Sequence, residues 1–161
     1  MSDTAVPDGN KLVFELKTGK VVIELRPDLA PLACERLKLL ATEGFYNGVP
    51  FHRVIEGFMA QGGDRSGTGT QGSHYPDLKA EFTDKAKFER GTVGMARTMA
   101  PHSANSQFFI MFADSPHLNG QYTIVGKVIE GMEYVDQIKR GSGAGGVVKD
   151  PDTIVKAYVE A

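Results

Sequence analysis

The feature of this sequence that most limits its fold is a succession of short β-prone runs separated by glycine-rich turns. The first two runs, residues 11–17 and 21–26, flank Thr18-Gly19, a dipeptide typical of a tight hairpin turn. Because the runs do not alternate with repeated helices, a doubly wound sheet is disfavoured and an antiparallel barrel or sandwich is favoured. Six further runs are candidate strands: 51–55, 58–61, 92–96, 107–112, 123–129 and 153–159.

Two segments change to a helical period. Apolar side chains recur at helical spacing between residues 33 and 41, where Pro31 suits the first turn and Gly44 suits the end. A second, shorter helix is predicted for residues 132–139. A glycine-rich loop, predicted to be flexible, then covers residues 141–146 and precedes the last strand.

The chain of 161 residues is predicted to be one domain (1–161), because no linker, repeat or low-complexity tract divides it. Cys34 is the only cysteine, so no internal disulfide can form, and we expect a small buried side chain there. The formal net charge is −2 and the basic residues are scattered, which argues against nucleic acid as a partner.

The first ten residues carry neither a basic segment nor an apolar one, so 1–10 is predicted to be a flexible segment rather than a targeting signal. No apolar run approaches the roughly 18 residues that a membrane-spanning helix needs. We therefore expect a cytoplasmic protein with no membrane partner.

Motifs of nucleophilic, metal or nucleotide chemistry are scarce. The segment 67–72 matches G-x-G-x-x-G, but Ser73-His74-Tyr75-Pro76 follows where a dinucleotide site needs a helix, so a plain glycine loop is favoured. The four histidines lack metal-ligand spacing, and neither a metal nor a cofactor is expected. A serine nucleophile at His102-Ser103 is an alternative, but nothing in the sequence supplies its carboxylate or oxyanion hole.

The segment 51–64 is unusual because Arg53 and Gln61 stand among aromatic and thioether side chains on two adjoining candidate strands. A second polar-beside-aromatic cluster occupies residues 106–110. Any single Phe or Met there is readily explained as core. Arg53 is harder to explain in that way, because a cation within a strand must reach solvent or a partner.

Five segments carry a resemblance to a known family: F-H-R-V-I-E-G-F-M-A-Q-G-G-D at 51–64, M-A at 95–96, S-Q-F-F-I at 106–110, L-N-G at 118–120 and V-I-E-G-M-E-Y-V at 128–135. Through them the chain closely resembles the cyclophilins, from about residue 12 to residue 159. The resemblance implies a closed eight-stranded antiparallel β-barrel capped by two α-helices. It also implies peptidyl-prolyl cis-trans isomerase activity, which rotates X-Pro bonds and assists protein folding; the alternative is a catalytically weak chaperone module that binds proline peptides.

Carried over by motif, the resemblance implies that Arg53 is the key catalytic residue. Gln61 either orients Arg53 or bonds the substrate backbone, and the sequence leaves this open. The implied partners are proline-containing peptides and folding protein clients. The implied proline pocket consists of Phe58, Met59, Phe109 and Leu118, bordered by Gln61 and Gln107, with Ala96, Arg97 and Thr98 along the groove for the preceding residues and His117 and Tyr122 in the pocket wall.

The sequence departs from the best-known eukaryotic pattern in that wall and groove. Met95-Ala96-Arg97-Thr98 replaces M-A-N-A, His117 stands in place of a tryptophan, and Tyr122 stands in place of a pocket histidine. This form resembles the bacterial branch of the family and implies preserved catalysis with only weak cyclosporin binding. A closed barrel has no free sheet edge, so we expect a monomer.

Overall fold

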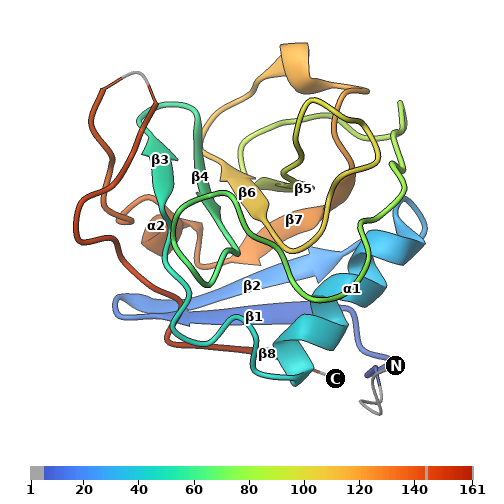
Figure 1. Cartoon of the computed structure of the whole chain (residues 1–161), viewed down its shortest axis with the longest axis horizontal. Coiled ribbons are helices and arrows are strands. Elements are labelled where there is room, and N and C mark those ends of the chain that lie inside the picture. The colour runs from blue at the N-terminus through green and yellow to red at the C-terminus, as the bar shows by residue number, and fades with distance from the viewer. Residues whose placement is uncertain (1–5, 144, 161) are drawn as a thin grey trace.

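Eight strands form one antiparallel sheet in the computed structural model, which describes residues 6–143 and 145–160 (Figure 1). The predicted hairpin is present as β1 (Lys11–Leu16) and β2 (Gly19–Leu25). The order of strands across the sheet is β3-β4-β6-β5-β7-β2-β1-β8. The remaining strands are β3 (Arg53–Ile55), β4 (Met59–Gly62), β5 (Thr92–Met95), β6 (Phe108–Met111), β7 (Ile124–Glu130) and β8 (Lys156–Glu160).

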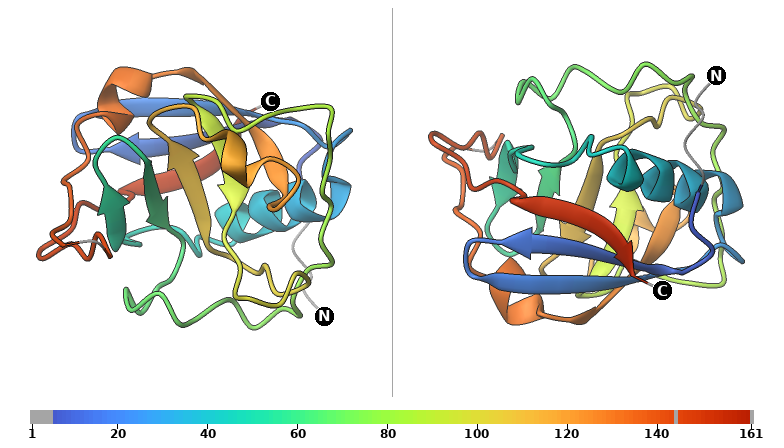
Figure 2. Two further views of the ribbon diagram at one scale, coloured as in Figure 1. Left: turned by 90° about the horizontal axis from the view of Figure 1, so that it is seen from above. Right: turned by 90° about the horizontal axis from the view of Figure 1, so that it is seen from below.

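The sheet curls into a half-barrel, and its two edge strands are covered by neighbouring segments of the chain (Figure 2). Near β8, an isolated bridge joins Pro50 to Thr153. Along β3, the amide of Val54 donates to the carbonyl of Gly146 at 2.8 Å, and that of Val148 donates to the carbonyl of His52 at 3.1 Å. The isolated bridge thus joins the segments that precede the two edge strands, and no ladder between β3 and β8 is present in the described residues.

The main core fills the concave side of the sheet and is completed by helix α1 (Pro31–Thr42). At its centre the ring of Phe108 lies 5.1 Å from Phe14 and 5.6 Å from Tyr46, centroid to centroid. The Tyr46 hydroxyl donates to the carbonyl of Ser106 at 2.8 Å, so the fully buried polar atom is satisfied. The predicted helical face of α1 is confirmed by the burial of Ala33, Cys34, Leu37, Leu40 and Ala41.

Helix α2 (Met132–Val135) is shorter than the predicted 132–139. The backbone turns on beyond Val135, but Arg140 Nη1 donates to the carbonyls of Asp136 and Ile138, and the amide of Lys139 donates to a carboxylate of Asp152. These side-chain bonds, two of them local and one from Asp152, take backbone groups that a continued helix would use. A short 3-10 helix, η1 (Pro116–Leu118), was not predicted.

The last strand begins at Lys156 instead of residue 153, because the amide of Ile154 donates to the carbonyl of Val49 and Thr153 bridges Pro50. Residues 1–5, 144 and 161 lie outside the described part of the chain. The predicted flexible segment 1–10 and the predicted loop 141–146 therefore fall partly outside the described residues.

Cys34 is fully buried, as predicted, and its Sγ donates to the carbonyl of Val125 at 3.3 Å. Burial raises the pKa of this thiol to about 12, so it stays protonated at neutral pH. In residues 6–143 and 145–160, no helix has the length and apolar character needed to cross a membrane.

Candidate active site

Three of the predicted site residues lie in one row across β3, β4 and β6. Arg53 pairs directly with Gln61, and Gln61 pairs directly with Phe109. Residues that pair across antiparallel strands point to the same face of the sheet, so these side chains share the convex face. The next row, Val54, Ala60 and Ile110, points into the main core.

A chain of polar side chains follows this row. Arg53 Nε donates to the carbonyl of Gly145 at 3.0 Å, and Arg53 Nη1 donates to Gln61 Oε1 at 3.2 Å. Gln61 Nε2 in turn donates to Gln107 Oε1 at 3.0 Å. Within the described residues, Arg53 Nη2 makes no hydrogen bond and no carboxylate forms an ion pair with this guanidinium. The arginine is held at two nitrogens and keeps donors available.

An apolar cluster separate from the main core borders this chain. Met59, Phe109 and Leu118 are buried in it, and Phe58 and Tyr122 pack against it half-exposed. The Tyr122 ring stands edge-on to Phe109 at 5.5 Å and 85°. The structure therefore brings together the residues that the resemblance assigns to a proline pocket. His117 joins them through its ring, which lies 5.9 Å from that of Phe58.

Beside the cluster runs a groove of about 930 Å³ that is lined partly by Gln61, Gln107, Ala96, Arg97 and Thr98. Five of the predicted site residues thus line this groove, whereas Arg53 is not among its lining residues.

Arg97 lies on the rim of this groove, but most of its guanidinium is engaged with the protein itself. It lies over the ring of Tyr122 at 4.7 Å and that of Phe82 at 5.8 Å. Its Nε and Nη2 both donate to the carbonyl of Gln121, at 3.0 and 2.8 Å. Arg97 thus braces the wall that carries Tyr122, a contact that sequence reasoning did not foresee.

Two supporting residues of the apolar cluster were missed in the sequence. Phe88 is buried and stacks on Phe109 at 5.6 Å with 20° between the rings. Gly94 pairs with Phe109, and a Cβ built there would lie 2.7 Å from Phe88 Cε1 and 2.8 Å from Phe109 Cζ. The signal for this close approach was available, because a glycine inside a strand pattern often marks a tightly packed neighbour.

The glycine loop 67–72 is organised by Asp64, which is completely buried. Burial raises the pKa of Asp64, but hydrogen bonds from Ser66, Gln71 and Gly69 outweigh this and hold the pKa below its ordinary value. The carboxylate is therefore charged at neutral pH. The loop is not followed by a helix, in agreement with the prediction of a plain glycine loop.

His52 lies next to Arg53 in sequence and is 8% exposed, with its Nδ1 buried and without a hydrogen-bond partner in the described residues. Burial lowers the pKa of His52 below its ordinary 6.5; nearby Asp64 acts in the opposite direction and Arg53 reinforces the shift. The imidazole is therefore neutral in the folded protein at neutral pH.

The alternative serine site is not assembled. Ser103 Oγ donates to the carbonyl of Ala100 at 2.6 Å and accepts from the amide of Thr98, while His102 Nδ1 accepts from the amide of Ala80. Neither side chain bonds the other among the described residues, so no nucleophile and base are paired.

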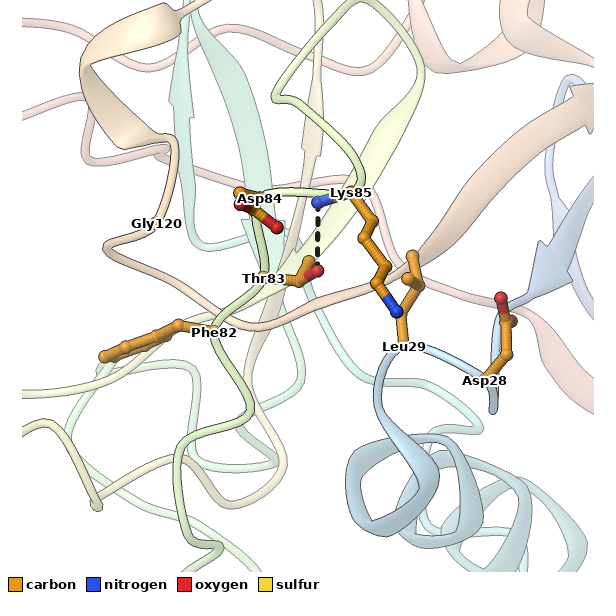
Figure 3. A pocket seen from close by; sticks show the side chains of 7 residues that line it. All are labelled: Asp28, Leu29, Phe82, Thr83, Asp84, Lys85 and Gly120. Atoms are coloured by element: carbon orange, nitrogen blue, oxygen red, sulfur yellow. Dashed lines mark hydrogen bonds between the residues drawn. The ribbon is translucent and has the colours of Figure 1, made fainter.

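A second hollow of about 550 Å³, shown in Figure 3, is lined by none of the predicted site residues. It is lined by Asp28, Leu29, segment 82–85 and Gly120. In the picture the Phe82 ring extends to one side, and the Lys85 side chain reaches toward Leu29. Its mixture of two carboxylates, one cation and open apolar surface defines no ligand.

Comparison with known proteins identifies the family of this chain. Residues 11–159 match the family model described as cyclophilin type peptidyl-prolyl cis-trans isomerase/CLD. A probable peptidyl-prolyl cis-trans isomerase of Brucella suis is 57% identical, over 98% of this chain and 86% of the relative. Peptidyl-prolyl cis-trans isomerase B of Bacillus subtilis is 42% identical, over 83% of this chain and 87% of the relative.

Among solved structures, the cyclophilin type isomerase of Cryptosporidium parvum superposes with a TM-score of 0.88 at 30% identity, covering 95% of this chain and 98% of that one. The same protein in the presence of the dipeptide Ala-Pro gives 0.87 at 31% identity, covering 94% of this chain and 99% of that one. The chain described here belongs to the cyclophilin-type peptidyl-prolyl cis-trans isomerases. Its activity is the cis-trans isomerisation of X-Pro peptide bonds.

The Gly94→Ala variant tests the close packing behind Phe109. The added methyl overlaps the rings of Phe88 and Phe109, so we expect a loss of about 1–3 kcal/mol in unfolding free energy from overpacking. We also expect lower kcat/KM, because Phe109 must move against Tyr122. Urea unfolding and an isomerase assay measure the two effects. A second change, Phe88→Leu, makes room and should recover part of both losses; wild-type behaviour of Gly94→Ala alone would contradict the packing argument.

The buried imidazole predicts a pH-dependent stability. Below pH 6.5 the unfolded chain protonates His52 while the folded chain keeps it neutral down to its lowered pKa. Protonation of the unfolded chain therefore costs no folding free energy above pH 6.5, and it lowers the stability of the folded state progressively as the pH falls below 6.5. We expect the unfolding free energy of the wild type to fall more than that of His52→Asn when the pH is lowered from 7 to 5, as measured by urea unfolding. His74→Asn, at an exposed position, controls for removal of an imidazole; a pH-independent difference for His52→Asn would refute the prediction.

Proposed function

We propose that Arg53 catalyses the isomerisation by donating a hydrogen bond to the proline nitrogen of the twisted X-Pro amide. The observation that carries this proposal is the state of its guanidinium. It is fixed at Nε and Nη1 on the face that bears the apolar cluster, and its Nη2 has no partner within the described residues.

The chemistry requires only such a donor. Amide resonance gives the C–N bond partial double-bond character and a rotation barrier of about 18–20 kcal/mol. At the perpendicular transition state the nitrogen loses conjugation and regains a basic lone pair. A donor aimed at that lone pair stabilises the twisted state more than either planar state, and this differential binding accelerates the reaction. Arginine suits the task because it stays charged and carries donors in a fixed fork.

The apolar cluster holds the proline ring in this proposal. Met59, Phe109 and Leu118 are its buried members. The Phe58 ring lies beside that of His117, and the Tyr122 ring stands edge-on to Phe109. A ring held still while the preceding carbonyl swings converts contact with Arg53 into selective stabilisation of the transition state. The residues before proline lie along the groove beside Ala96 and Thr98.

Gln61 is assigned the orienting role instead of a direct bond to the substrate backbone. Its Oε1 accepts from Arg53 and its Nε2 donates to Gln107, so both ends of its amide are engaged within the protein.

The substrates are proposed to be proline-containing peptides in unfolded or folding protein clients. The relative from Cryptosporidium parvum has been crystallised in the presence of Ala-Pro, which supports recognition of this dipeptide unit. We further propose that the protein works as a monomer in the cytoplasm without a cofactor. The edge strands support the monomer, because segment 146–148 bonds along β3 and the amide of Ala157 in β8 donates to Asn47 Oδ1, so neither edge is fully open to a second copy.

Replacing the proposed donor tests the mechanism. We expect Arg53→Ala to lower kcat/KM about 100- to 1,000-fold, the usual cost of removing one preorganised transition-state donor. Arg53→Lys should rescue little, because the ammonium is a compact point charge and lacks the planar fork that places donors on separate nitrogens toward Gly145, Gln61 and the substrate. A protease-coupled assay on an Ala-Pro peptide measures the rates. Arg26→Ala removes an exposed arginine as control, urea unfolding verifies the fold, and unchanged activity of Arg53→Ala would exclude the assigned role.

The wall residue His117 makes a separate prediction about cyclosporin. Its ring lies beside Phe58, at the position where drug-sensitive relatives are expected to carry tryptophan. We expect weak inhibition of the wild type by cyclosporin and stronger inhibition of His117→Trp, because the larger ring adds apolar contact and an N–H donor. Inhibition constants from the same peptide assay test this. No gain in the variant would show that His117 does not form this wall.

A further inference from the structure

We propose that Asp64 is a positioning residue that sets the direction of the Arg53 guanidinium through the glycine loop and two glutamines. Asp64 is buried beneath the loop and has no place in the apolar cluster or among the groove-lining residues. The inference rests on the proposed role of Arg53 and concerns how that arginine is aimed.

The two carboxylate oxygens of Asp64 accept hydrogen bonds from different parts of the loop. Oδ1 accepts from the amide and the hydroxyl of Ser66, at 2.8 and 2.7 Å. Oδ2 accepts from the amides of Gly69 and Gln71, at 2.8 and 3.1 Å, with the Thr68 hydroxyl at 3.4 Å. A charged acceptor with several donors fixes the loop strongly, since charge-assisted hydrogen bonds are about twice as strong as neutral ones.

The loop transmits its conformation to Gln107. Gln107 Nε2 donates to the carbonyl of Gly69 and to the carbonyl of Gln71, both at 3.0 Å. These are the two residues whose amides Oδ2 of Asp64 holds. An amide NH2 group has two donors, and both are used here, so the orientation of the Gln107 side chain is determined by the loop. Its Oε1 must then face Gln61.

The orientation of the Gln107 amide determines that of Gln61, which in turn bonds Arg53. Because Gln107 Oε1 can only accept, Gln61 must present its Nε2 to it, and Gln61 Oε1 is left facing Arg53 Nη1. The opposite orientation would place an NH2 group against a guanidinium, and neither group has an acceptor to offer. The carboxylate of Asp64 therefore fixes one orientation of two amides in series, and the last of them aligns the arginine.

The division of labour between the two oxygens supplies matched variants. Asp64→Ala removes the acceptor for Gly69 and Gln71 and should lower kcat roughly 10- to 100-fold through misalignment of Arg53, with a smaller change in KM because the apolar cluster is intact. Ser66→Ala removes the hydroxyl donor to Oδ1 and the contact of that hydroxyl with Thr68, but it keeps the acceptor for the amides of Gly69 and Gln71. We therefore expect its activity to stay close to wild type. The protease-coupled assay compares both, with urea unfolding to verify that the variants are folded at the assay temperature.

Two further measurements separate positioning from general damage. The side-chain amide signals of Gln61 and Gln107 and the Nε–H signal of Arg53, observed by ¹⁵N NMR, should move in Asp64→Ala and stay in Ser66→Ala. In the Arg53→Ala background, Asp64→Ala should cost little more activity, since the arginine it positions is already absent. The inference would be overturned if the activity loss of the double variant equalled the product of the losses of Arg53→Ala and Asp64→Ala. It would also be overturned if the amide signals stayed at their wild-type positions in Asp64→Ala.

If Asp64→Ala does not fold, Gln107→Met tests the same connection. It removes both loop-facing donors without disturbing the buried carboxylate, and it should show the same Arg53-dependent loss and the same shift of the Gln61 amide signal. An Arg53-independent loss in Gln107→Met would overturn the inference as well. Retained activity in Arg53→Ala alone would refute the proposed function, while the NMR signals would still show whether Asp64 orients the two glutamines.

Discussion

Side-chain alternation along β4 and β6 is the constraint on which the rest of the molecule depends. Ala60 and Ile110 are a cross-strand pair that faces the main core. The next pair, Gln61 on β4 and Phe109 on β6, faces the site. A slip of one residue in this register would exchange the two faces completely. Packing of the core and assembly of the site are therefore the same event in folding, and the polar row cannot form on a chain whose core is mispacked.

The apolar cluster is supported by contacts that Phe88 and Arg97 make with its rings. Phe88 fills the space that Gly94 leaves open and supports Phe109 from below, and Arg97 supports Tyr122 from the outside. Catalysis by differential binding needs this support, since a pocket that yields to the rotating amide would stabilise planar and twisted states equally. The apolar cluster and the chain of polar side chains from Arg53 to Gln107 are thus fixed by separate sets of contacts.

The sequence predicted the strands and the first helix because local periodicity reports which face each residue takes. It also marked Arg53 and Gln61, since polar groups among aromatic ones on adjoining strands are conspicuous. It did not predict Phe88 or the bracing by Arg97, because these contacts join segments whose juxtaposition depends on the order of strands in the sheet. The end of α2 was wrong for a similar reason: Arg140 and Asp152 take its backbone groups from outside the helix.

The choice of partners for Arg53 has an electrostatic consequence. Its two hydrogen bonds go to neutral oxygens, the Gly145 carbonyl and Gln61 Oε1, and in the described residues no carboxylate pairs with it. A carboxylate would hold the guanidinium more firmly but would cancel most of its field at the proline nitrogen. Neutral acceptors fix its direction and leave the charge uncompensated. The negative charge of Asp64 is used in hydrogen bonds to the loop and forms no ion pair with Arg53 in the described residues. In this proposal Asp64 therefore orients the guanidinium without neutralising its charge.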